Sequence, residues 1–189
     1  TRFFLDALGM RSGRQSGKHC VTAGQCYDSF YLAKGGDVTG ALDGIRIFDM
    51  SRVLAGPSWT QLLGDLGADI VKVERPGEGD DTRKWGPPFL RDEAGHDTAE
   101  SSYYLSANRA KRSITLDFTK PEGRAIALRL IAQSDVLVEN YKVGNLAKYG
   151  LDYPSLKKDF PRLVYCSVTG FGQTGPYAQS APQPNKITL

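Results

Sequence analysis

The stretch that determines the fold class is residues 44–74, which read GIRIFDMSRVLAGPSWTQLLGDLGADIVKVE. Residues 44–49 and 68–74 are apolar runs typical of buried strands, and residues 58–66 lie between them with apolar side chains at helical spacing. Pro57 stands in the first turn of the expected helix and Gly67 follows its end, as is usual for these residue types. A strand, a helix and a strand within about 30 residues predict a βαβ unit with a right-handed crossover, and hence a parallel sheet. The expected apolar face of the helix is Trp59, Leu62, Leu63 and Leu66.

The same alternation continues toward the carboxyl terminus. Residues 113–116, 135–139 and 163–168 are strand-like, and residues 119–122 have the form of a capping box at the start of a second helix. The expected buried face of that helix is Ile126, Leu130 and Ile131. We therefore predict an α/β fold with a partial doubly wound (Rossmann-like) parallel sheet, and a long polar loop over residues 76–102.

Composition excludes several classes of function. Of the 189 residues, 40% are hydrophobic and 24% are charged, which is typical of a globular protein. Residues 1–41 contribute +2 of the formal net charge of +3, so the rest of the chain is close to neutral. A near-neutral body does not provide the broad positive face that nucleic-acid binding requires. No apolar run is long enough to cross a bilayer, so neither nucleic acid nor a membrane is an expected partner.

The two ends of the chain differ from its body. Residues 7–27 contain no acidic residue but several basic residues among Ser and Gly, so residues 1–41 are expected to be a disordered tail or a transit-peptide remnant, which favours the mitochondrial matrix. Residues 182–189 continue no predicted element and are expected to be an unrelated ending. The three cysteines, Cys20, Cys26 and Cys166, show no metal-binding spacing and are expected to be free thiols.

Two motifs are candidates for binding phosphate. Residues 170–175 fit G-x-G-x-x-G after a strand, but Pro176 follows at once and prevents the helix that a dinucleotide site needs. Residues 108–112 (Asn-Arg-Ala-Lys-Arg) form a basic cluster that either grips a phosphate or is a solvated turn. Arg75 is better placed, because it follows a strand at the edge of a parallel sheet where ligands bind. The spacing of the polar residues indicates no catalyst and no metal site.

The chain resembles family III CoA-transferases (the CaiB/BaiF family) almost without interruption over residues 42–181. The resemblance rests on an ordered series of motifs at residues 42–49, 52–57, 66–77, 79–80, 108–117, 121–123, 135–141 and 170–177. It identifies the predicted sheet as the first part of the family's large domain, incomplete at its carboxyl end.

The resemblance implies that coenzyme A or an acyl-CoA binds as a substrate and that no cofactor is permanently bound. The residues that match the family's CoA-binding positions are Val53, Ala55, Arg75, Leu116, Asn140, Tyr141 and Lys148. It also favours phosphate binding by the basic cluster through Arg109, Lys111 and Arg112. Thr119 stands where some relatives have a lysine, so that contact is not expected here.

The resemblance further implies transfer of CoA from an acyl-CoA such as succinyl-CoA to a small dicarboxylic acid such as glutarate, through an aspartyl intermediate. In relatives the nucleophilic Asp follows the Gly-Pro-Tyr motif, but this sequence has no Asp after Asp159. We therefore expect this chain to be inactive alone and only marginally stable, whereas full-length relatives form interlocked homodimers. The alternatives are a CoA-thioester racemase that works by proton transfer and a non-catalytic CoA-binding remnant.

Overall fold

The computed structural model describes residues 40–180. All but the last two residues of the predicted tail (1–41), and all of the predicted ending (182–189), lie outside this range. The described residues belong to one compact unit, which we describe by itself.

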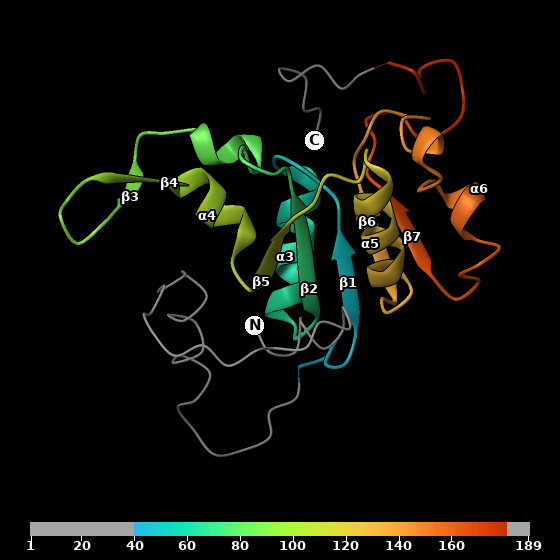
Figure 1. The fold of residues 1–189 in the computed structure, drawn as a ribbon, viewed down its shortest axis with the longest axis horizontal. Coiled ribbons are helices and arrows are strands. Elements are labelled where there is room, and N and C mark those ends of the chain that lie inside the picture. The colour runs from blue at the N-terminus through green and yellow to red at the C-terminus, as the bar shows by residue number, and fades with distance from the viewer. Residues whose placement is uncertain (1–39, 181–189) are drawn as a thin grey trace. The chain divides into compact units, whose positions relative to one another are not determined.

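A five-stranded sheet forms the centre of the described part (Figure 1). Every neighbouring pair of strands in it is parallel, and the spatial order is β5-β2-β1-β6-β7. The strands are β1 (Arg46–Asp49), β2 (Asp69–Glu74), β5 (Lys111–Thr115), β6 (Val136–Glu139) and β7 (Val164–Ser167). Helix α3 (Ala55–Asp65) joins β1 to β2, and α5 (Pro121–Ile131) joins β5 to β6.

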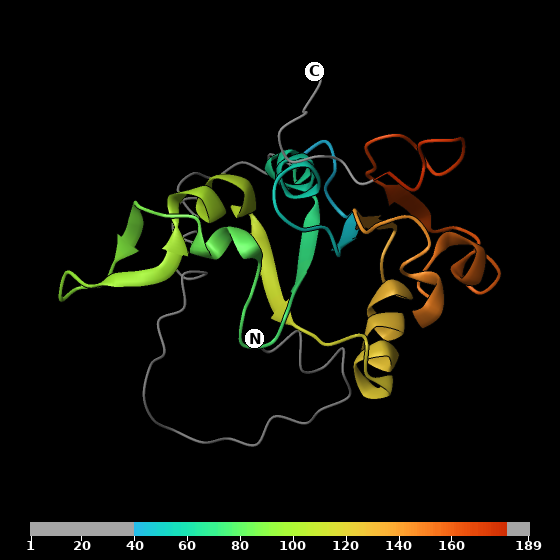
Figure 2. The same ribbon diagram turned by 90° about the horizontal axis from the view of Figure 1, so that it is seen from above.

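The two helices lie on opposite faces of the sheet, as both views show (Figures 1 and 2). From β1 the chain builds the sheet outward through β2 and β5, and it then returns to place β6 and β7 on the other side of β1. The predicted doubly wound, Rossmann-like α/β fold is therefore confirmed. The strand order reverses between β1 and β6, and this point is where open α/β sheets bind their ligands.

The core lies on both faces of the central strands, and on one face Leu63 of α3 packs on the cluster of Ile47, Ile70 and Val138. Ile47 and Phe48 of β1, and Leu137 and Val138 of β6, are at most 1% exposed. From α5, Ala127, Leu130 and Ile131 are buried, so Leu130 and Ile131 of the expected apolar face are buried as predicted. Burial of such side chains is the main favourable term in folding, at roughly 25 cal/mol per Å² of apolar area.

The prediction for the buried face of α3 was wrong. Trp59, Leu62 and Leu66 are 39%, 57% and 49% exposed, and only Leu63 packs on the core. The helix instead buries its small and polar side, which consists of Gly56, Pro57, Thr60, Gln61 and Gly64. A Cβ at Gly64 would lie 3.0 Å from the Ile70 side chain, so this glycine allows the helix to approach the sheet closely.

Residues 76–102 do not form the single long loop that the sequence predicted. They contain the short helix η1 (Asp81–Lys84) and the antiparallel hairpin of β3 (Phe89–Arg91) and β4 (Asp97–Ser101). Helix α4 (Ser102–Asn108) follows and packs on α3. Side chains organise this segment: Asp80 accepts a hydrogen bond from the Thr82 N–H, and Ser101 caps α4 by accepting one from the Tyr104 N–H.

The predicted capping box at residues 119–122 also does not form. Helix α5 is preceded by Lys120, whose side chain makes no cap, and Thr119 instead donates its hydroxyl hydrogen bond to Asp117 (2.6 Å). After β6 the chain forms the short helices η2 (Ala147–Tyr149) and α6 (Tyr153–Leu156). Residues 170–180 contain no helix, so the helix that a dinucleotide site needs does not follow the glycines of residues 170–175. No helix within residues 40–180 has the length and apolar character to span a membrane.

Two lysine side chains, each 1% exposed, are buried against the sheet. Lys72 lies within β2 and Lys111 begins β5, and their ammonium groups reach the residues at and just after the end of β1. Lys72 lies 3.0 Å from the carboxylate of Asp80, and Lys111 lies 3.2 Å from that of Asp49. Lys111 Nζ also donates to the Pro57 carbonyl (2.7 Å) and to the Asn108 side chain (3.2 Å), so all three of its N–H groups have acceptors. Burial lowers the pKa of Lys111 to about 8, although the charge of Asp49 opposes this shift.

We expect Asp49→Ala to lower the free energy of unfolding by about 3–5 kcal/mol, because it leaves the charge of Lys111 buried without its carboxylate. Urea unfolding followed by circular dichroism measures this loss. The matched control is Asp65→Ala, which removes the exposed partner of Arg109 and should cost at most about 1 kcal/mol. If Asp49→Ala does not fold, Asp49→Ala with Lys111→Met should recover stability. Equal losses for Asp49→Ala and Asp65→Ala would contradict the importance of the buried pair.

A second prediction concerns Glu74, at the end of β2. Burial raises the pKa of its carboxyl, but hydrogen bonds and charge from Arg83, together with a hydrogen bond from Ser113, outweigh burial and lower the pKa to about 2 from 4.5. Because the folded-state pKa lies below the ordinary value, this carboxylate stabilises the fold above about pH 5, by about 3 kcal/mol, and the contribution is lost as the pH falls toward 2. We expect Arg83→Met to flatten this part of the profile of unfolding free energy against pH. If the unfolding free energy of Arg83→Met falls with pH below 5 as steeply as that of the wild-type protein, the Glu74–Arg83 pair does not cause the loss of stability in acid.

Candidate ligand site at the carboxyl edge of the sheet

The loops that follow β1 and β6 meet at the point where the strand order reverses. The side chain of Asn140 joins them, because its oxygen accepts a hydrogen bond from the Arg52 N–H (2.8 Å) and its nitrogen donates one to the Arg52 carbonyl (2.7 Å). The fold thus places Arg52, Asn140 and Tyr141 at the edge of the sheet where α/β ligands bind.

A hollow of about 490 Å³ opens beside these loops, a volume within the usual range for small-molecule sites. Three basic side chains line it, namely Arg52, Arg75 and Lys148. Three aromatic side chains also line it, namely Phe118, Tyr141 and Tyr149. The remaining walls include Leu116 and Leu146, and the acidic Glu78 and Asp117 stand at the same hollow. We call this the basic hollow.

The cations of the basic hollow are held by exchangeable partners. Arg52 pairs with Asp81, and Arg75 lies 3.0 Å from Glu78 and 3.5 Å from Asp81, with side chains that are 28% to 58% exposed. Lys148 is exposed, and its amino group lies 5.0 Å from the centre of the Tyr149 ring. Exposed ion pairs contribute little to stability, so a bound anion can replace these carboxylates at small cost.

Tyr141 forms the inner wall of the basic hollow. Its ring packs edge-on against Phe118 with a centroid distance of 5.7 Å. Burial raises the pKa of its hydroxyl to about 12, which outweighs the opposing effect of the Arg52 charge. The hydroxyl is therefore neutral at physiological pH, and Tyr141 offers an apolar ring together with an uncharged hydrogen-bonding group.

Val53 has a strained backbone next to this hollow. Its φ is +68°, in the left-handed region that β-branched residues rarely occupy. Such a conformation costs on the order of 1–3 kcal/mol and persists only where the surroundings enforce it. The Val53 N–H points to the carboxylate of Asp80, at 3.2 Å and 3.4 Å from its two oxygens.

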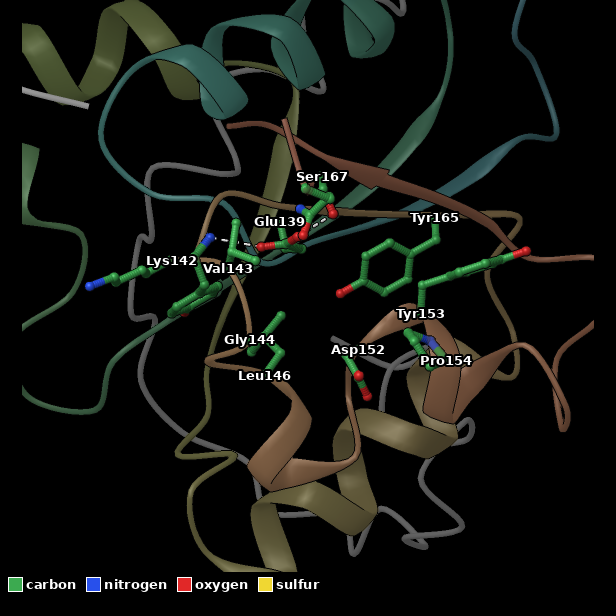
Figure 3. Close-up of a pocket in the computed structure, with 12 residues that line it drawn as sticks. Glu139, Lys142, Val143, Gly144, Leu146, Asp152, Tyr153, Pro154, Tyr165 and Ser167 are labelled. Carbon is green, nitrogen blue, oxygen red and sulfur yellow. Dashed lines mark hydrogen bonds between the residues drawn. The ribbon is translucent and has the colours of Figure 1, made fainter. Parts of the chain in front are cut away.

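A second hollow, of about 290 Å³, lies at the ends of β6 and β7 and shares Tyr141 and Leu146 with the first. Glu139 is buried at its base and accepts hydrogen bonds from the Ser167 hydroxyl and the Tyr141 N–H (Figure 3). Burial raises the pKa of Glu139, although these hydrogen bonds oppose the shift. One oxygen of Asp152 is buried there without a partner in the described part of the chain, and Lys142 points away from Glu139. This acidic hollow suits hydrogen-bond donors rather than phosphate.

The structure brings together four of the predicted site residues in the basic hollow: Arg75, Leu116, Tyr141 and Lys148. Asn140 lies beside the hollow and is hydrogen-bonded to the backbone of Arg52. Val53 also lies beside it, as the residue that follows Arg52 in the chain. Ala55 is the exposed first residue of α3. Thr119 lines the hollow at the position where some relatives have a lysine.

The predicted basic cluster is directed elsewhere. Arg109 pairs with Asp65 (2.6 Å), Arg112 pairs with Asp69 (2.6 Å), and Lys111 is the buried partner of Asp49. None of the three lines the basic hollow. They separate because Lys111 and Arg112 are consecutive residues of β5 and their side chains point to opposite faces of the sheet.

Sequence reasoning missed Arg52, Phe118 and Tyr149. Arg52 follows the carboxyl end of β1, so the rule that selected Arg75 after β2 also applies to it. Phe118, in the loop after β5, and Tyr149, in η2, gave no such signal, because neither follows the end of a strand in a recognisable motif. Among the described residues, no group of acidic, histidine or cysteine side chains is arranged to hold a metal ion.

The geometry can be compared with known proteins. Residues 42–182 match CoA-transferase family III. The chain is 55% identical to the succinate–glutarate CoA-transferase of Agrobacterium fabrum over 140 residues, and 52% identical to the human succinyl-CoA:glutarate CoA-transferase, in each case over 74% of this chain. The crystal structure of a CaiB/BaiF family protein from Brucella suis matches with a TM-score of 0.70 and 55% identity, covering 76% of this chain and 37% of that protein.

These similarities extend over only part of the relatives. The chain spans 35% of the length of the Agrobacterium protein and 30% of that of the human protein. The matched part nevertheless includes the whole sheet and the basic hollow. The chain belongs to CoA-transferase family III.

Proposed function

We propose that the basic hollow binds the nucleotide half of coenzyme A or of an acyl-CoA. The observation that carries this proposal is the convergence of Arg52, Arg75 and Lys148 around an aromatic-lined hollow at the point where the strand order reverses. Arginine forks and a lysine ammonium suit phosphate groups, and the rings of Phe118, Tyr141 and Tyr149 provide apolar surface for the rest of the nucleotide.

The reaction of the whole protein, on this proposal, is transfer of CoA from an acyl-CoA such as succinyl-CoA to a small dicarboxylic acid such as glutarate. The printed activities of the Agrobacterium and human relatives support this substrate class. A carboxylate nucleophile would carry the acyl group as an anhydride and the CoA as a thioester. The racemase alternative has less support, because the printed activities of the relatives are CoA transfers.

We expect the chain to bind coenzyme A, with Arg75→Ala and Lys148→Ala each weakening the affinity by about tenfold, or about 1.4 kcal/mol, because each removes one charge-assisted contact. Isothermal titration calorimetry measures the affinity. The matched control is Arg112→Ala, an equally basic residue that is paired with Asp69 away from the hollow. If Arg112→Ala weakens CoA binding as much as Arg75→Ala does, the phosphate groups bind at the basic cluster and not in the basic hollow.

A further inference from the structure

Arg75 has a carboxylate at each of its two terminal nitrogens. Its Nη1 lies 3.0 Å from Glu78 Oε2, and its Nη2 lies 3.5 Å from Asp81 Oδ1. A guanidinium group binds a phosphate through these same N–H groups, which form a planar fork. A phosphate that reaches Arg75 therefore meets N–H groups that already have acceptors.

The two carboxylates differ in their position relative to the basic hollow. Glu78 lines the hollow, whereas Asp81 is not among the described residues that line it. Asp81 also pairs with Arg52, and it directly follows Asp80, which is buried. Glu78 is therefore the carboxylate that a ligand entering the hollow meets at Arg75.

The Glu78 side chain can leave Arg75 without a change in the backbone. Residues 75–79 form a turn that is closed by a hydrogen bond from the Gly79 N–H to the Arg75 carbonyl (3.0 Å), and Glu78 lies within this turn. The Glu78 side chain is 58% exposed and that of Arg75 is 48% exposed. Because an ion pair between such exposed groups contributes little to stability, rotation of the Glu78 side chain frees Nη1 of Arg75 at small cost.

We propose that Glu78 is an internal counter-ion of the basic hollow, which occupies the Arg75 guanidinium in the free protein and is displaced by a phosphate of the ligand. Binding is then an exchange of one anion for another, and Glu78 lowers the affinity of the site. Such a residue suits a protein that has to release a CoA thioester in every turnover. This inference rests on the proposed binding of CoA in the basic hollow.

The test is the affinity of Glu78→Gln for CoA, measured by isothermal titration calorimetry at constant ionic strength. Glutamine has nearly the same size as glutamate, and its amide oxygen can still accept a hydrogen bond from Arg75, but it carries no charge. We expect the variant to bind CoA about fivefold more tightly than the wild-type chain, at the upper end of what an exposed ion pair contributes.

Asp117→Asn is the matched control for the change in net charge. Asp117 lines the same hollow, but its carboxylate accepts hydrogen bonds from the Thr119 N–H (3.0 Å) and the Thr119 hydroxyl (2.6 Å). Its replacement removes one negative charge without releasing an arginine. We expect this variant to gain less than about twofold in affinity, because salt screens the remaining long-range effect.

A second comparison ties the gain to Arg75. In the Arg75→Ala background, Glu78 has no guanidinium to occupy, so Glu78→Gln should raise the affinity for CoA by no more than Asp117→Asn does. The difference between the gains in the two backgrounds is the coupling between Glu78 and Arg75.

The possible outcomes separate this inference from the proposed function. Equal gains for Glu78→Gln and Asp117→Asn, or a Glu78→Gln gain that persists without Arg75, would reduce the effect to net charge and overturn the counter-ion. Unchanged or weaker CoA binding by Glu78→Gln would also overturn it, and would leave the CoA site intact. If neither the wild-type chain nor Glu78→Gln binds CoA, the proposed site and the counter-ion are both wrong.

Discussion

Two lysine ammonium groups are buried where the parallel strands end, and the segments around them are arranged to supply their acceptors. Lys72 and Lys111 are central in this respect, because an uncompensated buried charge costs several kcal/mol. Their acceptors come from the end of β1, the first turn of α3, the loop before η1 and the end of α4. Elements that are distant in the sequence are thus tied to one edge of the sheet.

The candidate site develops from this constraint. The carboxylate of Asp80 neutralises Lys72 and also accepts a hydrogen bond from the Val53 N–H. One residue therefore both compensates a buried charge and fixes the backbone beside the candidate site. The basic hollow lies directly outside this network, where Arg52 and Arg75 keep exposed carboxylate partners that a ligand can displace. The buried pair keeps the backbone of the site rigid, and the exposed ion pairs leave the arginines free to exchange their carboxylate partners for an anion. A preorganised anion site requires both properties.

The sequence predicted the parallel, doubly wound sheet, because hydrophobic periodicity and the βαβ rule depend on local pattern alone. It failed for the exposed face of α3, where hydrophobicity favoured Trp59 and Leu62 but close approach to the sheet required the small side with Gly64. It also treated residues 108–112 as one charged cluster. Pleating of β5 directs Lys111 and Arg112 to opposite sides, and which side is buried depends on Asp49, a residue 62 positions away.

The exposed stripe of α3 has a spectroscopic consequence. Both tryptophans of the chain lie at the surface of the described part, Trp59 at 39% and Trp85 at 46% exposure. Each indole is therefore partly in contact with water in the folded state, and Trp85 also packs edge-on against Tyr103 with a centroid distance of 5.1 Å. Intrinsic fluorescence of this protein therefore reports on whatever covers α3 or the segment after η1.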